Sequence, residues 1–549
     1  MTTRVIYPRG VATGAGCDTD IIINAINGAG PKGIVGYTGG GNQSYANPMV
    51  EGDVLIMKKA TQAGAATAWY LAKPITEGCP EALARTPARS PLVDGTTNFN
   101  AEVPWVNQQV AIGIDSKSIE IQGELDEPGN PATIVKGAVD AATFMTTLTS
   151  WWSTMWGGGD PTQYQQDGGM FVFGGQQQST IRNIKFQWGD SYKIISCAGI
   201  SVINCDFELC GGTWNELIYA KCDNRYTGFV DIKDCGFTNN GGYMDIRCGG
   251  KDVTVEGCDF HPLTDVWEDI NDIWNLAPFI WSSIHCEGDG WYTPRFNAGS
   301  AIFYVPDNSF TVKNCTTDRT AAFRDHGPWV GIQLGIEGWG AELPVGVNAV
   351  IHDSVVDNCT FTEGEYYYAP VLLTNANMNN QRLESTSVVN CTFTSCGGNT
   401  NFGPAAGCVA LAALNIQDCM VSNNTYTSVA NSDGTHGPGV YMWSADNCQV
   451  VKDDFRNSGI ATVTVNSSLT CVVMDSCNCC TVFESGMVPT GQGGPANFVT
   501  DINGYSNRLV GSPANHVEKP IGIGAAVRGA RAVVMAQVET YKAHKPHAP

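Results

Sequence analysis

The 549-residue sequence has little charge, and positive charge is the scarcer kind. Only 15% of its residues are charged, whereas soluble domains average about 25%. Its 53 acidic residues outnumber 31 Lys and Arg, which gives a net charge of −22. Such a surface repels phosphate, so we expect no nucleic-acid partner. Because 43% of the residues are hydrophobic, a core can form and a disordered polyelectrolyte is excluded.

Long hydrophobic runs are also missing. No window approaches the roughly 18 consecutive apolar residues of a membrane span, and the opening Met1–Pro8 lacks a hydrophobic signal region. We therefore expect no membrane partner and no signal peptide in the chain as given. A mature secreted protein and a protein released by cell lysis both fit this pattern, which predicts an extracellular or virion location.

The sequence is instead rich in glycine (63 residues) and in cysteine (21 residues), and many of the cysteines follow one template. The template alternates apolar residues and then adds a small polar residue, Cys, any residue and often Phe, as in Val202–Phe207 and Ile232–Phe237. We identify ten copies, and their Cys-equivalent positions are Ile184, Cys205, Cys235, Cys258, Cys315, Cys359, Cys391, Cys419, Asp453 and Cys477.

Each copy predicts a short strand that cannot bury its apolar face alone. Stacking the copies as coils about 4.8 Å apart solves this problem and piles like residues into internal ladders. The Cys and Phe side chains then point inward, and Asn or Asp side chains at the turn bond along the stack. We expect reduced, buried cysteines rather than metal ligands or disulfides. The cluster Cys477–Cys480 is the one dense group of cysteines, but without a histidine nearby it is only a weak signal for a zinc site.

With these coils, the chain resembles the pectin lyase-like superfamily of right-handed parallel β-helices. Asp18–Asn27 is similar to the family's capping helix, and Gly33–Gly39 to its first strand. Lys117–Glu124, Pro131–Gly137 and Gly169–Gly175 resemble the next coils. The resemblance implies an all-β fold, a single-stranded right-handed parallel β-helix with a helix capping its N-terminal end.

The rhythm of the repeats sets the expected domain boundaries. We expect an N-terminal cap over residues 1–31 and a β-helix over residues 32–512, with a long lateral insertion at about 41–104. Residues 513–549 are expected to form a helical C-terminal cap, because an open end of the stack would aggregate. A tail that docks a partner is the alternative.

The resemblance also implies where a ligand binds. In this family the strand before the repeated template usually builds, with its loops, a groove for sugar chains. Alternation turns polar side chains outward from these strands, and tryptophans suited to stacking on sugar rings accompany them. The candidate catalytic residues are Asp245, His285, Glu287, Asp325 and His326, and the candidate substrate-binding residues are Lys221, Arg247, Trp281, Trp291, Arg324 and Trp329.

Two chemistries stay open at this stage. Hydrolysis needs two carboxylates about 5 to 9.5 Å apart, for which Asp245, Glu287 and Asp325 are candidates. Elimination from a uronic acid needs a base for the C5 proton and a cation for the carboxylate. The candidates for these two roles are Lys221, Arg247, His285, Arg324 and His326. Calcium held by groove carboxylates is compatible with either, and no other cofactor or metal site is identified. The motif series of polygalacturonases and pectate lyases is not reproduced, which argues against pectin.

Our leading hypothesis is therefore a lyase or glycoside hydrolase that cleaves a complex polysaccharide, with acidic ones among the candidates. The alternative is a non-catalytic phage tailspike or adhesin that binds glycans, and the third is a structural subunit that binds protein partners. We expect a monomer for the enzyme and a homotrimer for the tailspike.

Overall fold

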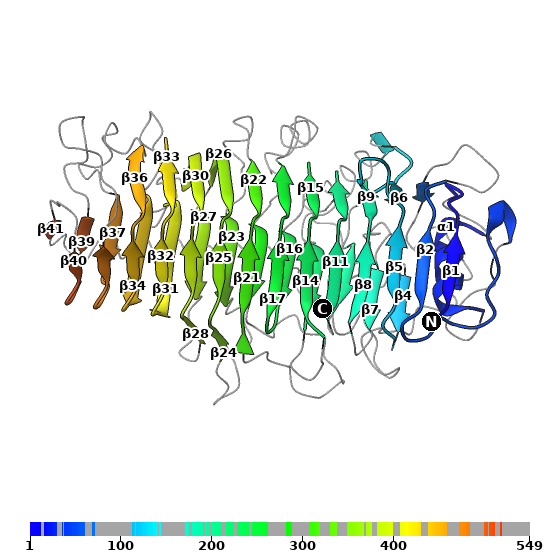
Figure 1. The fold of residues 1–549 in the computed structure, drawn as a ribbon, viewed down its shortest axis with the longest axis horizontal. Coiled ribbons are helices and arrows are strands. Elements are labelled where there is room, and N and C mark those ends of the chain that lie inside the picture. Colours follow the sequence, from blue (N-terminus) through cyan, green and yellow to red (C-terminus); the bar gives the residue numbers. More distant parts are fainter. Residues whose placement is uncertain are drawn as a thin grey trace, which may run out of the picture.

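The computed structural model is a long stack of short parallel strands, which follow one another along its axis in chain order (Figure 1). The structure describes residues 1–11, 16–29, 36, 38–60, 69–71, 112–115, 117–140, 142–143, 171–174, 178–189, 193–196, 199–210, 216–222, 228–240, 244–261, 282–287, 307–318, 330–336, 349–366, 369–375, 381–398, 407–429, 438–457, 471–483, 499–502, 504–510 and 516–518.

Each regular coil contributes one strand to each of three parallel sheets, which we name C, A and B in the order in which the chain visits them. Sheet A contains β1 (Thr3–Ile6), β2 (Val54–Met57), β5 (Glu120–Gly123), β8 (Ser179–Arg182), β11 (Ile200–Ile203), β14 (Val230–Lys233), β17 (Val253–Glu256), β21 (Phe310–Lys313), β25 (Val355–Asp357), β29 (Ser387–Val389), β32 (Met420–Ser422), β35 (Gln449–Val451), β38 (Thr481–Phe483) and β40 (Arg508–Val510).

Sheet B is reached from sheet A through a two-residue turn in the repeated template. Its strands are β3 (Trp69–Leu71), β6 (Thr133–Lys136), β9 (Ile184–Gln187), β12 (Asp206–Glu208), β15 (Gly236–Thr238), β18 (Asp259–His261), β22 (Thr316–Asp318), β26 (Thr360–Tyr366), β30 (Thr392–Gly398), β33 (Thr425–Thr427) and β36 (Asp454–Asn457).

Sheet C includes the longest strands and three short strands beside its main path. The main path is β4 (Ile112–Asp115), β7 (Phe171–Gly174), β10 (Ile194–Ser196), β13 (Glu216–Lys221), β16 (Met244–Gly249), β19 (Ser282–Glu287), β23 (Val330–Ile336), β27 (Ala369–Asn375), β31 (Val409–Gln417), β34 (Val440–Asp446), β37 (Val472–Asp475), β39 (Val499–Ile502) and β41 (His516–Glu518); beside it lie β20 (Asp307–Asn308), β24 (Ala349–Ile351) and β28 (Gln381–Glu384).

The strands pair in register, so like residues lie above one another as predicted. Phe361 pairs with Phe393, and Phe393 with Tyr426. Their rings stack with centroids 4.9 and 5.1 Å apart and planes within 9° of parallel. Phe455 continues the pile at 4.4 Å from Tyr426, and all four side chains are buried. The parallel β-helix fold is thereby confirmed.

The turn between sheets A and B also matches the prediction through Cys391. The template cysteines up to that residue are free and buried. The residue before each Cys adopts a left-handed conformation, as at Asn204 (φ 49°) and Asn358 (φ 51°). An Asn tolerates this conformation and offers its side chain to the next coil. Asn358 Nδ2 donates to Asn314 Oδ1 at 2.8 Å, which continues the stack in polar form.

The last part of the cysteine ladder differs from the prediction. Asn424, not Cys419, follows Cys391, because β29 pairs with β32 and the Cys391 amide donates to Asn424 Oδ1 at 2.8 Å. Asp453 comes next, as predicted, and its Oδ1 accepts from the Asn424 amide at 2.9 Å. Cys419 instead precedes a sheet A strand, and Cys477 lies between sheets C and A. The template misplaced both because an apolar pair followed by a polar residue and Cys also occurs at that turn.

Several domain boundaries also need correction. Strand β1 lies within the expected cap and pairs with β2, while β2 and β3 lie within the expected insertion and belong to sheets A and B. Strand β41 lies beyond residue 512. Short strands between glycine-rich segments lack the Cys template, so they escaped detection.

Helix α1 (Asp18–Asn27) covers the residues expected to be helical and packs against β1, β3 and β4. Cys17, just before it, is disulfide-bonded, unlike the ladder cysteines. Most of Gly33–Gly39 lies outside the described residues, and so do residues 519–549 of the expected helical C-terminal cap. Within the described ranges, no helix is long and apolar enough to cross a membrane.

Removing one ring from the aromatic pile tests the packing. Phe393→Ala leaves a cavity between Phe361 and Tyr426 and is expected to lower the free energy of unfolding by about 3 to 5 kcal/mol. Thr394→Ala, on the same strand but half-exposed, should change it by less than about 0.5 kcal/mol. Denaturant titration of both variants measures this, and equal effects would contradict the ladder.

The buried carboxyl of Asp453 makes stability depend on pH. Burial raises its pKa to about 7, although Asn424 and Tyr426 donate hydrogen bonds to it. The contribution of Asp453 to the free energy of unfolding is therefore complete below about pH 4 and is lost as the pH rises through 7. The loss amounts to roughly 4 kcal/mol at most.

Asp453→Asn should abolish this part of the pH dependence. Melting temperatures of both proteins between pH 4 and pH 8 provide the measurement. If the wild type and the variant lose stability in parallel over this range, Asp453 is not the responsible group.

Candidate functional site

Four polar side chains from neighbouring strands of sheet C lie in one line across the stack. Tyr219 pairs with Arg247, Arg247 with His285, and His285 with Gln333. We call these four residues the sheet C file. Ile246 and Cys248 belong to the hydrophobic core, so the alternate residue Arg247 projects from the opposite face of the sheet. The predicted alternation therefore brings Arg247 and His285 together on adjacent strands, about 4.8 Å apart.

The described residues of this face are not exposed, which differs from the open surface that we expected. The exposed fractions are 5% for Asp245, 1% for Arg247 and 0% for His285. Nδ1 of His285 lies 3.2 Å from Sδ of Met244. Alternation in a sequence tells which side of a strand a residue occupies and says nothing about what covers that side. Keeping charged groups inside a protein is costly unless they are paired, and such clusters concentrate at functional sites.

The other predicted site residues cannot be placed in full. The backbones of Lys221 and Glu287 end strands β13 and β19, opposite Gly249 and Gly335 respectively, but their side chains lie outside the described residues. The same holds for the whole of the remaining candidates, which are Trp281, Trp291, Arg324, Asp325, His326 and Trp329.

The register separates two of the proposed hydrolytic carboxylates. Met244 pairs with Ser282 and Ile246 with Ile284, so Asp245 is level with Ser283. Glu287 lies four residues further along β19, which puts the two backbones about 13 Å apart along the strand direction. Glycosidases hold their two carboxyl groups about 5 to 9.5 Å apart. Asp245 and Glu287 are thus separated along the strands, whereas Arg247 and His285 are direct neighbours, and this pair suits a cation and a base.

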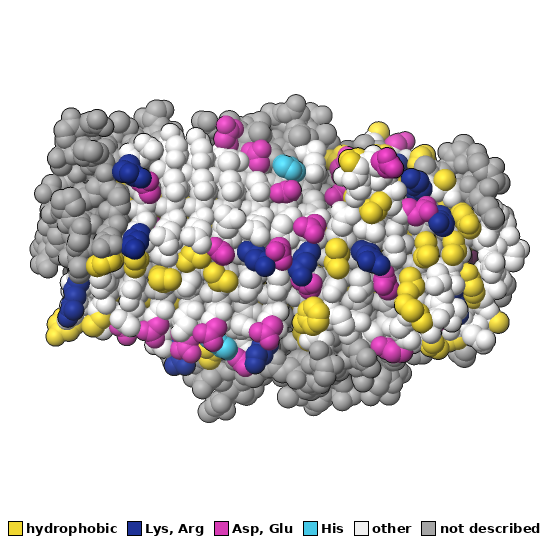
Figure 2. All heavy atoms as spheres, viewed as in Figure 1, with side chains coloured by type: hydrophobic (Ala, Val, Ile, Leu, Met, Phe, Trp, Pro, Cys, Tyr) yellow, Lys and Arg dark blue, Asp and Glu magenta, His cyan; other side chains and the backbone are white. Residues whose placement is uncertain are grey.

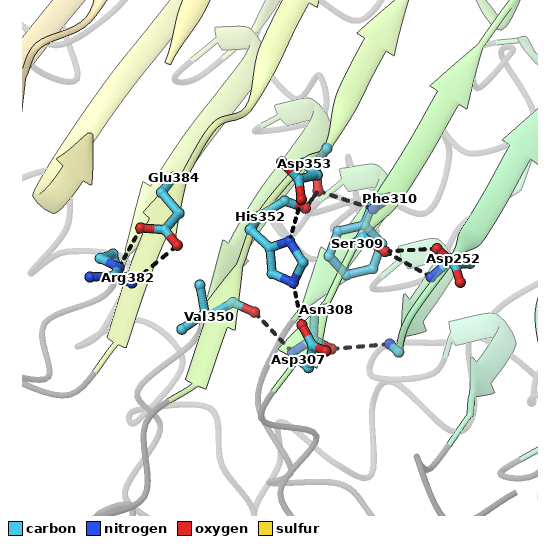
Figure 3. Close-up of polar contacts among 12 residues, drawn as sticks. Asp252, Asp307, Asn308, Ser309, Phe310, Val350, His352, Asp353, Arg382 and Glu384 are labelled. Carbon is cyan, nitrogen blue, oxygen red and sulfur yellow. Dashed lines mark hydrogen bonds and ion pairs between the residues drawn. The ribbon is translucent and has the colours of Figure 1, made fainter. Parts of the chain in front are cut away.

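A second cluster, which the sequence did not single out, surrounds His352 at the edge of sheet C (Figure 3). His352 follows β24, and its Nε2 contacts Oδ1 of Asp307 on β20 in the preceding coil. Its Nδ1 lies 2.9 Å from Oδ2 of Asp353. Figure 2 shows acidic side chains gathered along this edge of the stack. In the sequence, only the adjacent pair His352–Asp353 points to this cluster, and it does not indicate that Asp307 is the third member.

The two carboxylates raise the pKa of His352 above its ordinary value. Both ring nitrogens contact carboxylates, so the charged imidazole links two neighbouring coils. It is therefore not free to act as a base. Nearby, Arg382 and Glu384 on β28 form an ion pair of 2.6 Å. Within the described ranges no three His, Cys, Asp or Glu residues are grouped to hold a metal ion.

Three comparisons with known proteins were made, and only the comparison of structures gave matches. No family model matches the chain, and no curated protein matches it. A mannuronic acid specific family 6 polysaccharide lyase from human gut microbiota is similar in structure, with 9% identity, a TM-score of 0.31, and coverage of 99% of this chain and 100% of that one. A tailspike protein of bacteriophage CBA120 has 10% identity, a TM-score of 0.27, and coverage of 74% and 56%.

A third similar structure is the A-module of a mannuronan C-5 epimerase from Azotobacter vinelandii, with 8% identity, a TM-score of 0.27, and coverage of 84% and 91%. At these identities and TM-scores, none of the three proteins indicates what this chain does.

The His352 cluster predicts a pH effect on stability. Because its pKa is raised in the folded state, its stabilising contribution is complete below about pH 6.5 and is lost as the pH rises through the folded-state value. His352→Gln should therefore reduce the loss of melting temperature between pH 6 and pH 9. His261→Gln removes an exposed histidine that forms no ion pair in the described part of the chain, and it should leave the pH profile unchanged. A profile identical to the wild type in the His352 variant would contradict the link.

Proposed function

We propose that this chain cleaves a polysaccharide containing uronic acid by β-elimination, with His285 as the base and Arg247 as the cation. The observation that carries the proposal is the pairing of Arg247 with His285 on adjacent strands of sheet C. A base and a cation side by side are the two groups that elimination requires. The register offers no comparable carboxylate pair between Asp245 and Glu287.

The steps follow from the positions of these groups. Arg247 binds the substrate carboxylate at C5 and neutralises its charge, which lowers the cost of removing the C5 proton. His285 takes that proton, and the electron pair forms a double bond between C4 and C5. The bond from C4 to the glycosidic oxygen then breaks, and the leaving oxygen takes a proton from His285 or from water. Asp245, two residues from Arg247 on the same face of β16, would orient its guanidinium.

The burial of the file sets a condition on this reaction. Because Arg247 and His285 are inaccessible, substrate reaches them only if the outer side of sheet C opens. A site poor in water would strengthen the attraction between Arg247 and the substrate carboxylate.

The same burial favours a second candidate function, a rigid glycan-binding protein without catalysis. In that case the file is a structural network, and the stack serves as a tailspike or adhesin. A homotrimer would be expected for the tailspike and a monomer for the lyase, which light scattering distinguishes. Either function places the protein outside cells or on a virion.

The test is a panel of uronic-acid polysaccharides, with formation of the unsaturated product followed by ultraviolet absorbance. His285→Gln and Arg247→Gln should each lower the rate at least about 100-fold, as expected for loss of an acid-base or charge-stabilising group. Tyr441→Phe is the matched control, because Tyr441 belongs to the same line of sheet C, several coils away, and is equally buried.

Thermal melting of each variant shows whether the fold is retained. Full activity in a folded His285 variant would refute the assignment of the base. Wild-type protein that binds glycans and forms no unsaturated product would support the non-catalytic alternative instead.

A further inference from the structure

Sheet B carries a regular array of threonines on its outer side. Thr360, Thr392 and Thr425 pair in register on β26, β30 and β33. Two residues further along each strand a second row follows in the same register. Between the two rows lie the inward-pointing rings of the aromatic pile. We call the six residues the threonine face: Thr360, Thr362, Thr392, Thr394, Thr425 and Thr427.

This face is uncharged on a protein whose net charge is −22. Figure 2 shows it as a broad area without charged or hydrophobic side chains, over the strands labelled β26, β30 and β33 in Figure 1. Exposed polar side chains extend it on both borders, namely Asn358, Asn390 and Asn423 on one side and Ser395 and Ser428 on the other. Charge returns at the ends, with Asp318 on β22 and the Asp454–Arg456 ion pair on β36, and at one border position, Glu363.

The six hydroxyl groups are held in place and remain available. Each side chain is half-buried and β-branched, so few rotamers are open to it. The stacked rings behind them fix the strands. In the part of the chain that the structure describes, no hydrogen bond is made by any of the six hydroxyl groups, so each can both donate and accept. Each methyl group beside a hydroxyl adds a small apolar contact.

We infer that the threonine face binds an uncharged, extended polysaccharide that lies along the stack. Sugar hydroxyls pair with threonine hydroxyls, and the C–H faces of sugar rings contact the methyl groups. The array repeats about every 4.8 Å along the stack, which suits a polymer that repeats the same groups along its length. A polyanion would be repelled by the carboxylates at both ends of the threonine face and by the protein's net charge of −22. A second copy of the chain is disfavoured, because the face has none of the aromatic, Met or Arg residues that dominate protein interfaces.

This surface is separate from the sheet C file and does not depend on catalysis. Sheets B and C form different sides of the stack, so binding and elimination can be lost independently. A lyase with this surface would hold neutral stretches of a mixed glycan on one side. A non-catalytic protein would use it as its main binding surface.

The experiment measures binding to xylan, mannan and glucan, with alginate and polygalacturonate as anionic polymers, by affinity electrophoresis or calorimetry. The wild-type protein should bind at least one neutral polymer more tightly than either polyanion. Thr392→Val combined with Thr394→Val keeps the shape and removes two hydroxyls, and it should weaken that binding roughly tenfold.

The matched control is Thr254→Val combined with Thr311→Val. These two threonines are half-exposed and paired in register on sheet A, so they test the loss of two hydroxyls from another side of the stack. The control should bind as the wild type does, and both double variants should melt within a few degrees of it.

Three results would overturn the inference. The first is that no neutral polymer binds, and the second is that both double variants bind equally well. The third is that light scattering shows self-association that the Thr392/Thr394 variant abolishes, which would assign the face to a second copy. Unimpaired binding by His285→Gln together with loss of elimination would leave the inference standing and separate it from the proposed lyase site.

Discussion

In-register hydrogen bonding between parallel strands of successive coils is the constraint on which the molecule depends. A short strand such as β12 or β33 has no partner within its own coil and is ordered only by the coils on either side. Because the side-chain period of a strand is two, a slip of one residue would turn Phe207 outward and Asp206 inward. The inner ladders and the outer files are therefore fixed together.

The same register decides which functional groups can meet. Arg247 and His285 are 38 positions apart in the sequence and become lateral neighbours because β16 pairs with β19. Asp245 and Glu287 lie on the same two strands and are kept apart along them. The strand register, more than the type of each residue, therefore decides which side chains can act together. This is why the proposal of elimination starts from the Arg247–His285 pairing.

Much of the fold is predictable because a repeated template states the register directly. The Cys and Phe positions from Cys205 to Cys391 are correct, since each copy carries the same turn. The error at Cys419 arises where Asn424 replaces Cys in the ladder and the same letters occur at another turn. The burial of Arg247 could not be predicted, because alternation assigns a side to a residue but not its covering. The threonine face contains no charged or aromatic residue, so the sequence patterns that indicate a ligand site do not mark it.

Charge is distributed unevenly around the stack, and this division has a physical cause. On sheet A, ion pairs such as Lys313–Glu256 (3.0 Å) link neighbouring strands, and carboxylates surround His352 at the edge of sheet C. In a stack of parallel strands like charges would lie directly above one another about 4.8 Å apart, so a file of one charged residue type would repel itself. A file can alternate its charges or carry none. Threonine satisfies the second condition and favours the β conformation, so an uncharged face can extend over several coils where a face of one charge sign cannot.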